Sequence, residues 1–530
     1  MMKKGLFALI ALLMPVFTFA QDEMGLDQKI DQAFKPISDF ISGIIFFEVF
    51  EGAPFVIILL VCSALFFTLY FGFPNIRFFG KAINVVRGKY DHVDHSSAGN
   101  DNLAVDGDIK DTIADESKEG EVTHFQALAT AVSGTVGNGN IAGVALAIAL
   151  GGPGATFWMV VCGLLGMSSK FVECTLGVQY RDIGEDGTVY GGPMYYLSKG
   201  LKEKGFAMLG KITAVLFAIF CIGGSFGGGN AAQSNQATIV LKELMGWESS
   251  SAGAIIGVTL AVLVGIIIIG GIKRIASVTE KIVPFMAVLY LAACLYIILS
   301  NFSLVNNAFA LIFQEAFDPQ AIGVGGVIGV LLVGFKRAAF SNEAGAGSAS
   351  IAHSAVKTKY SASEGLVALL EPFIDTVVIC TMTALVIIIY NFGGNFDYGG
   401  EGSVMIDGVA YEGAGITSKA FGQYIPYSNV FLTIAVVLFA VSTMISWSYY
   451  GLQSWKFLFG RGRTADLTYK FLFLGFVVIG AAASMDSIWG FSDAMIFAMV
   501  FPNMIGLFFL FPIVKKELAR YLSAIKGSKS

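Results

Sequence analysis

Apolar stretches long enough to cross a lipid bilayer recur along this chain, and they limit its fold more than any other feature. A helix needs about 20 predominantly apolar residues to cross the hydrocarbon core. Only 14% of the 530 residues are charged, against roughly 25% in soluble globular chains. We therefore predict an all-α polytopic membrane protein with eleven spans. The apolar windows cover residues 53–73, 126–150, 155–178, 212–238, 252–271, 282–300, 322–345, 365–391, 428–450, 468–485 and 490–513.

The distribution of Lys and Arg predicts how these spans are oriented. If the N-terminus lies outside, the segments predicted to lie inside carry most of the basic residues. Because Lys and Arg concentrate in cytoplasmic loops, we expect a multi-pass protein of a bacterial cytoplasmic (inner) membrane, with a periplasmic N-terminus and a cytoplasmic C-terminus. The predicted outside segments of the mature chain hold only Lys29, Lys35, Lys242 and Lys419.

Residues 1–20 have the order of a cleavable signal peptide. Lys3 and Lys4 precede an apolar stretch that is too short to span, and small residues follow before Gln21. The Gly-rich residues 392–426 predict an outside loop or a short hairpin. The remaining expected parts are a periplasmic segment (21–50), an extra transmembrane helix (51–74), a cytoplasmic linker (75–124), two five-helix repeats (125–300 and 301–514) and a cytoplasmic tail (515–530).

The second apolar window contains a stretch that is unsuited to a continuous helix, SGTVGNGNIAG at 133–143. Unpaired backbone groups cost several kcal/mol in hydrocarbon, so a Gly-rich interruption persists only when it is buried in protein or lines a polar cavity. The N–H groups that begin the following half-helix would attract an anion, and the carbonyls that end the preceding half would suit a cation. Glycines can also serve close helix packing, but packing does not account for Asn138 and Asn140 within the cluster. The glycines are Gly134, Gly137, Gly139 and Gly143.

A second interruption lies at 334–350, GFKRAAFSNEAGAGSAS, in the seventh window. It is five spans after the first. Corresponding interrupted helices in two halves are typical of secondary transporters built from inverted repeats, with a binding site near the bilayer midplane. An odd number of spans per repeat places the two copies in opposite orientations. The sequence thus predicts two repeats of five spans, with the span at 53–73 as an extra.

Four stretches closely resemble the alanine or glycine:cation symporter family, the sodium:alanine symporters. The resemblance implies a LeuT-type 5+5 inverted repeat plus one extra N-terminal transmembrane helix. It also implies a secondary active symporter that takes up small neutral amino acids, such as alanine and glycine, coupled to sodium by alternating access. The stretches are GTVGNGNIAGVALAIALGGPGATFWMVVCGLLGMSSKFVE (134–173), FSNEAGAGSASIAH (340–353), FIDTVVICTMTAL (373–385) and STMISWSYYG (442–451).

The same resemblance implies which residues bind. Backbone N–H groups in the first interruption would hold the substrate carboxylate, and Trp447 would cap a small side chain. Hydroxyl and carbonyl oxygens would hold Na⁺ as the coupling ion. The implied substrate residues are Thr135, Gly137, Gly139, Asn140, Asn230, Gln233, Thr443 and Trp447. The implied sodium residues are Ser133, Val136, Ser442 and Thr443.

Ionisable residues at membrane depth leave two interpretations open. Lys170, Glu173, Lys336, Arg337 and Glu371 are expected mostly to form gating or structural ion pairs. Proton coupling through Glu343 or Asp375 is the alternative to sodium coupling within the same fold. The four histidines, His92, His95, His124 and His353, are assigned no chemistry.

Other classes of function find little support. An intramembrane enzyme would need a nucleophile with a base, or metal ligands, at depth, and the scattered histidines and isolated cysteines supply no such set. No nucleotide is expected, because Gly137, Gly139 and Gly143 are spaced GxGxxxG rather than GxGxxG. A net charge of −5 argues against nucleic acid. A channel stays open as an alternative, and the oligomeric state is undetermined. The expected partners are a small neutral amino acid and the lipid bilayer.

Overall fold

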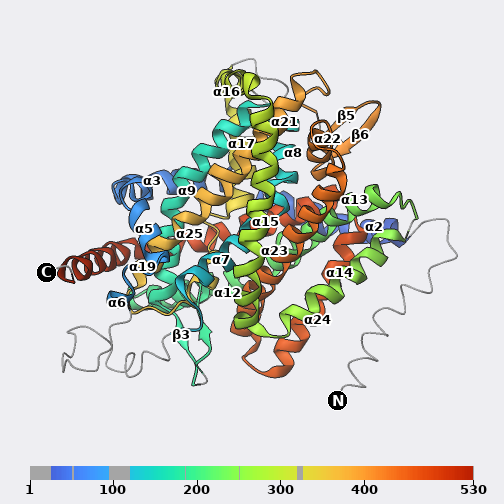
Figure 1. The fold of residues 1–530 in the computed structure, drawn as a ribbon. Helices are drawn as coiled ribbons and strands as arrows, with labels where there is room; N and C mark the ends of the chain where they lie inside the picture. The colour runs from blue at the N-terminus through green and yellow to red at the C-terminus, as the bar shows by residue number, and fades with distance from the viewer. Residues whose placement is uncertain are drawn as a thin grey trace.

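The structure, a computed structural model, describes residues 26–50, 53–94, 120–185, 187–249, 251–318, 326–400 and 402–528. The predicted signal peptide at 1–20 and residues 95–119 of the predicted linker lie outside the described residues. Figure 1 shows a bundle of packed helices, with α16 (Phe302–Ala316) and α21 (Thr381–Asn391) towards the top and α24 (Arg463–Ala482) towards the bottom.

Every apolar window forms helix over most of its length. Before the first interruption lie α2 (Leu26–Ile45), α3 (Phe55–Tyr70), α4 (Pro74–Arg77), α5 (Phe79–Val86) and α6 (Asp91–Asp94). The predicted linker at 75–124 is therefore partly helical. The first predicted repeat holds α7 (His124–Thr135), α8 (Ala142–Gly151), α9 (Gly154–Gln179), α12 (Ala207–Phe226), α13 (Ala232–Met245), α14 (Ala252–Ile268) and α15 (Gly271–Ser300).

The second predicted repeat begins with α16 (Phe302–Ala316), which precedes its first apolar window. It continues with α17 (Gly326–Asn342), α18 (Ala349–His353), α19 (Ser361–Ala368), α20 (Leu370–Pro372), α21 (Thr381–Asn391), α22 (Ala414–Gly422), α23 (Ser428–Phe459), α24 (Arg463–Ala482) and α25 (Met485–Gly527). Short helices α10 (Pro193–Tyr195) and α11 (Leu201–Glu203) connect α9 to α12, with the π-helical turn η3 (Tyr196–Gly200) between them.

The described residues contain seven helical stretches that are long and apolar enough to cross a membrane. An eighth candidate is α7 with α8, bent by 57° at the break between them. The helices α3, α14 and α17 are shorter, at 16, 17 and 17 residues. The all-helical membrane fold is thus confirmed, and the count of eleven spans stays a prediction.

Both predicted interruptions are breaks in the helices. In the first, α7 ends at Thr135, and a 3₁₀ turn, η2 (Asn138–Asn140), precedes α8. In the second, α17 runs unbroken to Asn342 and the chain turns at 343–348 before α18. The interruption expected at 334–350 thus begins later than predicted, because the Lys, Arg and Ala residues after Gly334 are strong helix formers.

Two π-helical segments lie next to these breaks. One, η4 (Gly227–Ala231), joins α12 to α13, and the other, η5 (Phe373–Cys380), joins α20 to α21. A π-turn widens a helix and redirects the side chains around it, and such turns are frequent at functional sites. Here η4 precedes Gln233, and η5 contains Asp375.

Strands are few and short among the described residues. The pairs are β1 (Glu48–Phe50) with β2 (Ala53–Pro54), β3 (Asp182–Ile183) with β4 (Val189–Tyr190), and β5 (Ser403–Ile406) with β6 (Val409–Glu412). The last pair confirms the hairpin interpretation of the Gly-rich segment. Its turn residues Asp407 and Gly408 both have positive φ, at 53° and 79°, as a two-residue hairpin turn of the primed type requires.

The helix α9 lies in the middle of the bundle and packs against α17, α19, α18 and α3. Its crossing with α17 is close because Gly334 has no side chain. A Cβ on Gly334 would lie 2.6 Å from the carbonyl oxygen of Ala155. The helices α8, α18 and α20 also contact α9, so elements next to both breaks pack against the same helix.

Candidate functional site

The first break uses its own side chains to satisfy its backbone. The N–H of Gly137 donates to Oδ1 of Asn140 at 2.9 Å, and the N–H of Asn138 donates to Oε1 of Gln233 at 3.0 Å. Nδ2 of Asn138 donates to the carbonyl of Gln233 at 3.2 Å. The N–H of Gly137, which is expected to hold a substrate carboxylate, thus already has an acceptor here. That acceptor is the neutral side-chain oxygen of Asn140.

Gly137 faces the helix α23 at very close range. A Cβ at this position would contact Oγ1 of Thr443 and would lie 3.0 Å from Oε1 of Gln233. The Thr443 hydroxyl is buried and has no hydrogen-bond partner among the described residues. Gly139 faces the second broken helix instead, with 3.5 Å between its would-be Cβ and Cα of Ser341. The break therefore lies between α23 on one side and α17 on the other.

The residues of the predicted sodium site lie where α7 ends against α23. The Ser133 hydroxyl donates to the carbonyl of Ser442 at 2.7 Å, and the Ser442 hydroxyl donates to the carbonyl of Phe439 at 2.9 Å. Val136 leaves the helical conformation, with ψ at 91°, directly after the last turn of α7. Helix ends leave carbonyls without intrahelical partners. The neighbourhood is thus rich in neutral oxygen atoms.

Two predicted substrate residues point elsewhere. The Thr135 hydroxyl donates back to its own helix, to the carbonyls of Ala131 and Val132 at 3.3 and 3.4 Å. Nδ2 of Asn230 donates to the carbonyl of Phe473 on α24 at 2.6 Å. The structure therefore brings Gly137, Gly139, Asn140, Gln233 and Thr443 together, whereas the side chains of Thr135 and Asn230 donate their hydrogen bonds to backbone carbonyls outside this set.

Trp447 lies one turn beyond Thr443 on α23 and is bonded to the second break. Its indole Nε1 donates to Oε1 of Glu343 at 3.0 Å, and the Ser348 hydroxyl donates to the other oxygen of that carboxylate. All three side chains are buried. Trp447 therefore connects α23, which faces the first break, to the turn that forms the second.

A set of polar residues joins the two breaks, and we call Asn140, Ser341, Asp375 and Thr376 the central cluster. Nδ2 of Asn140 donates to Oδ1 of Asp375 at 2.7 Å. The hydroxyls of Ser341 and Thr376 donate to Oδ2 at 2.9 and 2.7 Å. Among the described residues no cationic side chain pairs with this buried carboxylate. The sequence singled out Asp375 but not Ser341 or Thr376, although small hydroxyl residues beside a break are a usable signal.

A second buried set is built from alternating charges, and we call His124, Lys170, His353, Glu364 and Glu371 the charge cluster. His353 contacts Glu364 through Nδ1 at 2.5 Å and Glu371 through Nε2 at 3.6 Å. His124 pairs with the other oxygen of Glu364, and Nζ of Lys170 lies 3.0 Å from Glu371. The carboxylates thus lie between basic groups on both sides.

The charge cluster ties five helices together, and it includes two histidines that sequence reasoning left without a role. His124 begins α7, whereas His353 ends α18. Glu364 belongs to α19, Glu371 to α20 and Lys170 to α9. Lys170, which was expected to form an ion pair, pairs with Glu371 at 3.0 Å and with Glu173 at 4.0 Å.

The two basic residues expected at the second break, Lys336 and Arg337, lie away from it. Arg337 forms an ion pair with Asp493 on α25, and Nζ of Lys336 lies 3.2 Å from the same carboxylate. Both basic residues sit on the intact part of α17. They therefore attach α17 to α25 rather than line the break.

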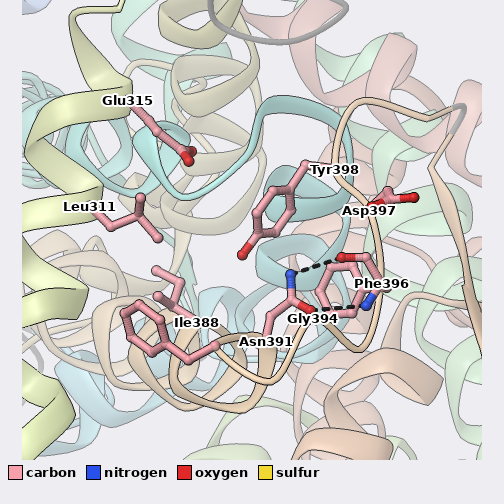
Figure 2. Close-up of a pocket in the computed structure, with 9 residues that line it drawn as sticks. Leu311, Glu315, Ile388, Asn391, Gly394, Phe396, Asp397 and Tyr398 are labelled. Atoms are coloured by element: carbon pink, nitrogen blue, oxygen red, sulfur yellow. Dashed lines mark hydrogen bonds between the residues drawn. The ribbon is translucent and has the colours of Figure 1, made fainter.

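A cavity of about 650 Å³ opens at the end of the bundle that carries α16 and the chain after α21. Figure 2 shows Glu315 and Leu311 on one side of it and Tyr398 and Asp397 on the other, with Asn391 hydrogen-bonded to the backbone of Phe396. Burial raises the pKa of Glu315 above its ordinary value. No predicted site residue lines this cavity.

The family profile and the related sequences agree on one family. The profile of the Sodium:alanine symporter family matches residues 38–530. The chain is 38% identical to the sodium/alanine symporter AgcS of Methanococcus maripaludis, over 90% of this chain and 96% of that protein. It is 34% identical to the probable sodium/glutamine symporter GlnT of Bacillus subtilis, over 79% and 83%. A crystal structure of MhsT in complex with L-phenylalanine aligns with a TM-score of 0.49 at 15% identity, over 75% of this chain and 99% of that one.

The family profile covers nearly the whole described chain, both helix breaks included. Membership excludes the enzyme interpretation, because the family consists of transporters. The chain belongs to the sodium:alanine symporter family and is a multi-pass membrane protein that moves amino acids together with a cation.

Proposed function

We propose that this protein takes up alanine, glycine or a similar small neutral amino acid, driven by sodium and working by alternating access. The close approach of Gly137 to Thr443 and Gln233 is the observation that carries the proposal. A backbone amide that no Cβ shields can be reached by a small carboxylate. The name of the Methanococcus relative, a sodium/alanine symporter, supports the same substrate and ion.

In this proposal the substrate carboxylate takes over amides at the first break. Asn140 and Gln233 supply the acceptors for the N–H groups of Gly137 and Asn138, and a carboxylate accepts more strongly than a neutral amide. Trp447 would close the site over the substrate side chain. Sodium would bind beside it to neutral oxygens of Ser133, Val136, Ser442 and Thr443.

We also propose the LeuT-type arrangement of two inverted five-span repeats after an extra span, with the N-terminus outside. Two observations support it. The broken helices α7–α8 and α17–α18 lie five predicted spans apart, and each contributes to the central cluster through Asn140 and Ser341. Cysteine-accessibility labelling of the N-terminal and C-terminal segments in intact cells tests the orientation.

Uptake of labelled alanine into proteoliposomes under an imposed sodium gradient tests the function. We expect accumulation above equilibrium with the gradient and a return to passive levels without it. Accumulation also separates a symporter from a channel, which only equilibrates its substrate. Equal uptake with and without the gradient would contradict sodium coupling.

Proton coupling is a second candidate, and the central cluster is the observation that favours it. Asp375 is a buried carboxylate bonded only to amide and hydroxyl donors among the described residues. If sodium drives transport, Asp375→Asn and Glu343→Gln should leave sodium-driven uptake largely intact, since Ser and Thr hydroxyls can rotate to accept from an amide. Loss of a proton-driven component in either variant, with sodium having no effect in the parent, would favour the proton.

A further inference from the structure

We propose that Glu343 is a positioning residue that fixes the Trp447 ring and thereby limits the size of the amino acid that the site accepts. The inference rests on the proposed function, because the position of Trp447 matters only if a small amino acid binds at the first break. Nothing in the sequence pairs these two residues, which are 104 positions apart.

Glu343 has a backbone conformation that ordinary residues avoid. Its φ is 53°, in the left-handed region, where a non-glycine residue is held only if its surroundings fix it. Its own N–H donates to the carbonyl of Ala339, and its carbonyl accepts from the N–H of Ala346, both at 3.0 Å. The turn therefore holds the carboxylate in one place, at the point where α17 ends.

Both carboxylate oxygens of Glu343 accept hydrogen bonds from neutral donors. One accepts from the Trp447 indole at 3.0 Å and the other from the Ser348 hydroxyl. Lys170 is instead paired with Glu371 at 3.0 Å and with Glu173 at 4.0 Å. Glu343 thus acts as a hydrogen-bond acceptor, and a neutral acceptor of the same shape should replace it.

Glycine backbone confines Trp447 from another direction. A Cβ on Gly229 in η4 would contact Cβ and Cγ of Trp447, and a Cβ on Gly224 would lie 3.4 Å from the indole ring. The Tyr450 ring packs edge-on at 5.3 Å between centroids. These contacts confine the indole on the sides of Gly224, Gly229 and Tyr450 while its N–H is bonded to Glu343.

The position of the indole ring matters because Trp447 lies on α23 next to a residue of the proposed site. Trp447 is one helical turn from Thr443, and Thr443 lies against Gly137, so both residues project from the same face of α23. If the bond to Glu343 is lost, the indole gains rotamers and space opens beside the substrate side chain. If the ring is pushed from the Gly224 side, that space shrinks.

The test measures how well other amino acids compete with labelled alanine for sodium-driven uptake in proteoliposomes. We expect Glu343→Ala and Trp447→Phe each to lower the inhibition constant of valine at least tenfold relative to that of alanine. Glu343→Gln retains an acceptor oxygen and should keep the parent ratio. The double variant Glu343→Ala with Trp447→Phe should be no broader than either single variant, because both remove the same bond.

A change on the opposite side of the ring should have the opposite effect. Gly224→Val would place side-chain atoms against the far edge of the indole, which lies 3.4 Å from a Cβ at this position, and should favour glycine over alanine by several-fold. If Glu343→Ala proves too unstable to purify, Trp447→Phe and Gly224→Val still test the inference. It is overturned if Glu343→Ala slows alanine uptake while valine stays excluded as in the parent, or if the double variant is additively broader.

The same assay distinguishes a failure of the proposed function from a failure of the role of Glu343. If the parent protein shows no sodium-driven alanine uptake, the proposed function fails. If the parent transports alanine and all variants keep its substrate range, only the role of Glu343 fails.

Discussion

The two buried polar clusters of this molecule are built on different principles. In the central cluster one carboxylate, Asp375, is surrounded by amide and hydroxyl donors. In the charge cluster, Glu364 and Glu371 lie between histidines and a lysine. Neutral donors can turn away to let another ligand approach, whereas separating buried opposite charges is costly. The first arrangement suits reversible binding, and the second suits holding helices in place.

The locations of the two clusters agree with this difference. The central cluster joins the two broken helices through Asn140 and Ser341. The charge cluster joins the beginning of α7, through His124, to α18, α19 and α20. The half-helix α7 therefore ends next to the central cluster and begins in the charge cluster.

The largest expected effect is at the first break. Gly137→Val should abolish alanine binding, because the added side chain would overlap Oγ1 of Thr443 and crowd Oε1 of Gln233. The measurement is the alanine-dependent thermal shift in the presence of sodium, which reports ligand binding to the folded state. Gly475→Val on α24 is the matched control, because no atom lies within 4 Å of its would-be Cβ. A thermal shift that survives Gly137→Val would mean that the substrate binds elsewhere.

The next largest effect is expected in the charge cluster. Lys170→Met leaves Glu371 and Glu173 without their lysine in a fully buried position, and breaking such a pair typically costs about 3–5 kcal/mol. The melting temperature in detergent should fall strongly, and adding Glu371→Gln should restore part of it. An unchanged melting temperature would show that the cluster does not stabilise the fold.

The same kind of deletion in the central cluster should cost less stability. Ser341→Ala removes one of the donors to Asp375, and hydrogen bonds to charged groups contribute about 1.5–3 kcal/mol. The variant should melt at a higher temperature than Lys170→Met in the same detergent. Equal melting temperatures of the two variants would remove the contrast between the clusters.

The smallest effect is expected at an exposed ion pair. Partial burial raises the pKa of Asp182, but the hydrogen bond from Arg461 and the charge of Lys199 outweigh it, and the pKa lies below its ordinary value. The stabilisation is therefore present above about pH 4 and is lost as the pH falls through the lowered pKa. With 43% of the Asp182 side chain exposed, Asp182→Asn should cost below about 1 kcal/mol at pH 7 and nothing well below pH 3. Melting curves of both proteins at the two pH values check this.

Features encoded locally were predictable from the sequence. The lengths of the apolar windows predicted the helices, and the glycine clusters inside two of these windows predicted both breaks. Inside a membrane, non-helical backbone persists only where it is buried in protein or lines a cavity. The hairpin β5–β6 followed from its glycines. The second break began later than expected, because helix propensity after Gly334 outweighed the glycine itself.

Features that depend on packing were not predictable. His124 and Glu364 are 240 residues apart, so nothing local distinguishes His124 from a histidine at the end of a span. The side chains of Thr135 and Asn230 turn away from the break through choices of rotamer and partner that residue type does not set. The pairing of Trp447 with Glu343 likewise depends on how the turn at 343–348 meets α23.

The internal capping of the first break by Asn140 and Gln233 affects the energetics of any carboxylate that binds there. Such a ligand exchanges one acceptor for another instead of satisfying empty donors, so its affinity reflects the difference between a charge-assisted bond and a neutral one. That difference is modest, and the displaced amides stay close enough to recapture the N–H groups when the ligand leaves. A protein that must release its cargo on every cycle gains turnover from this competition within its own chain.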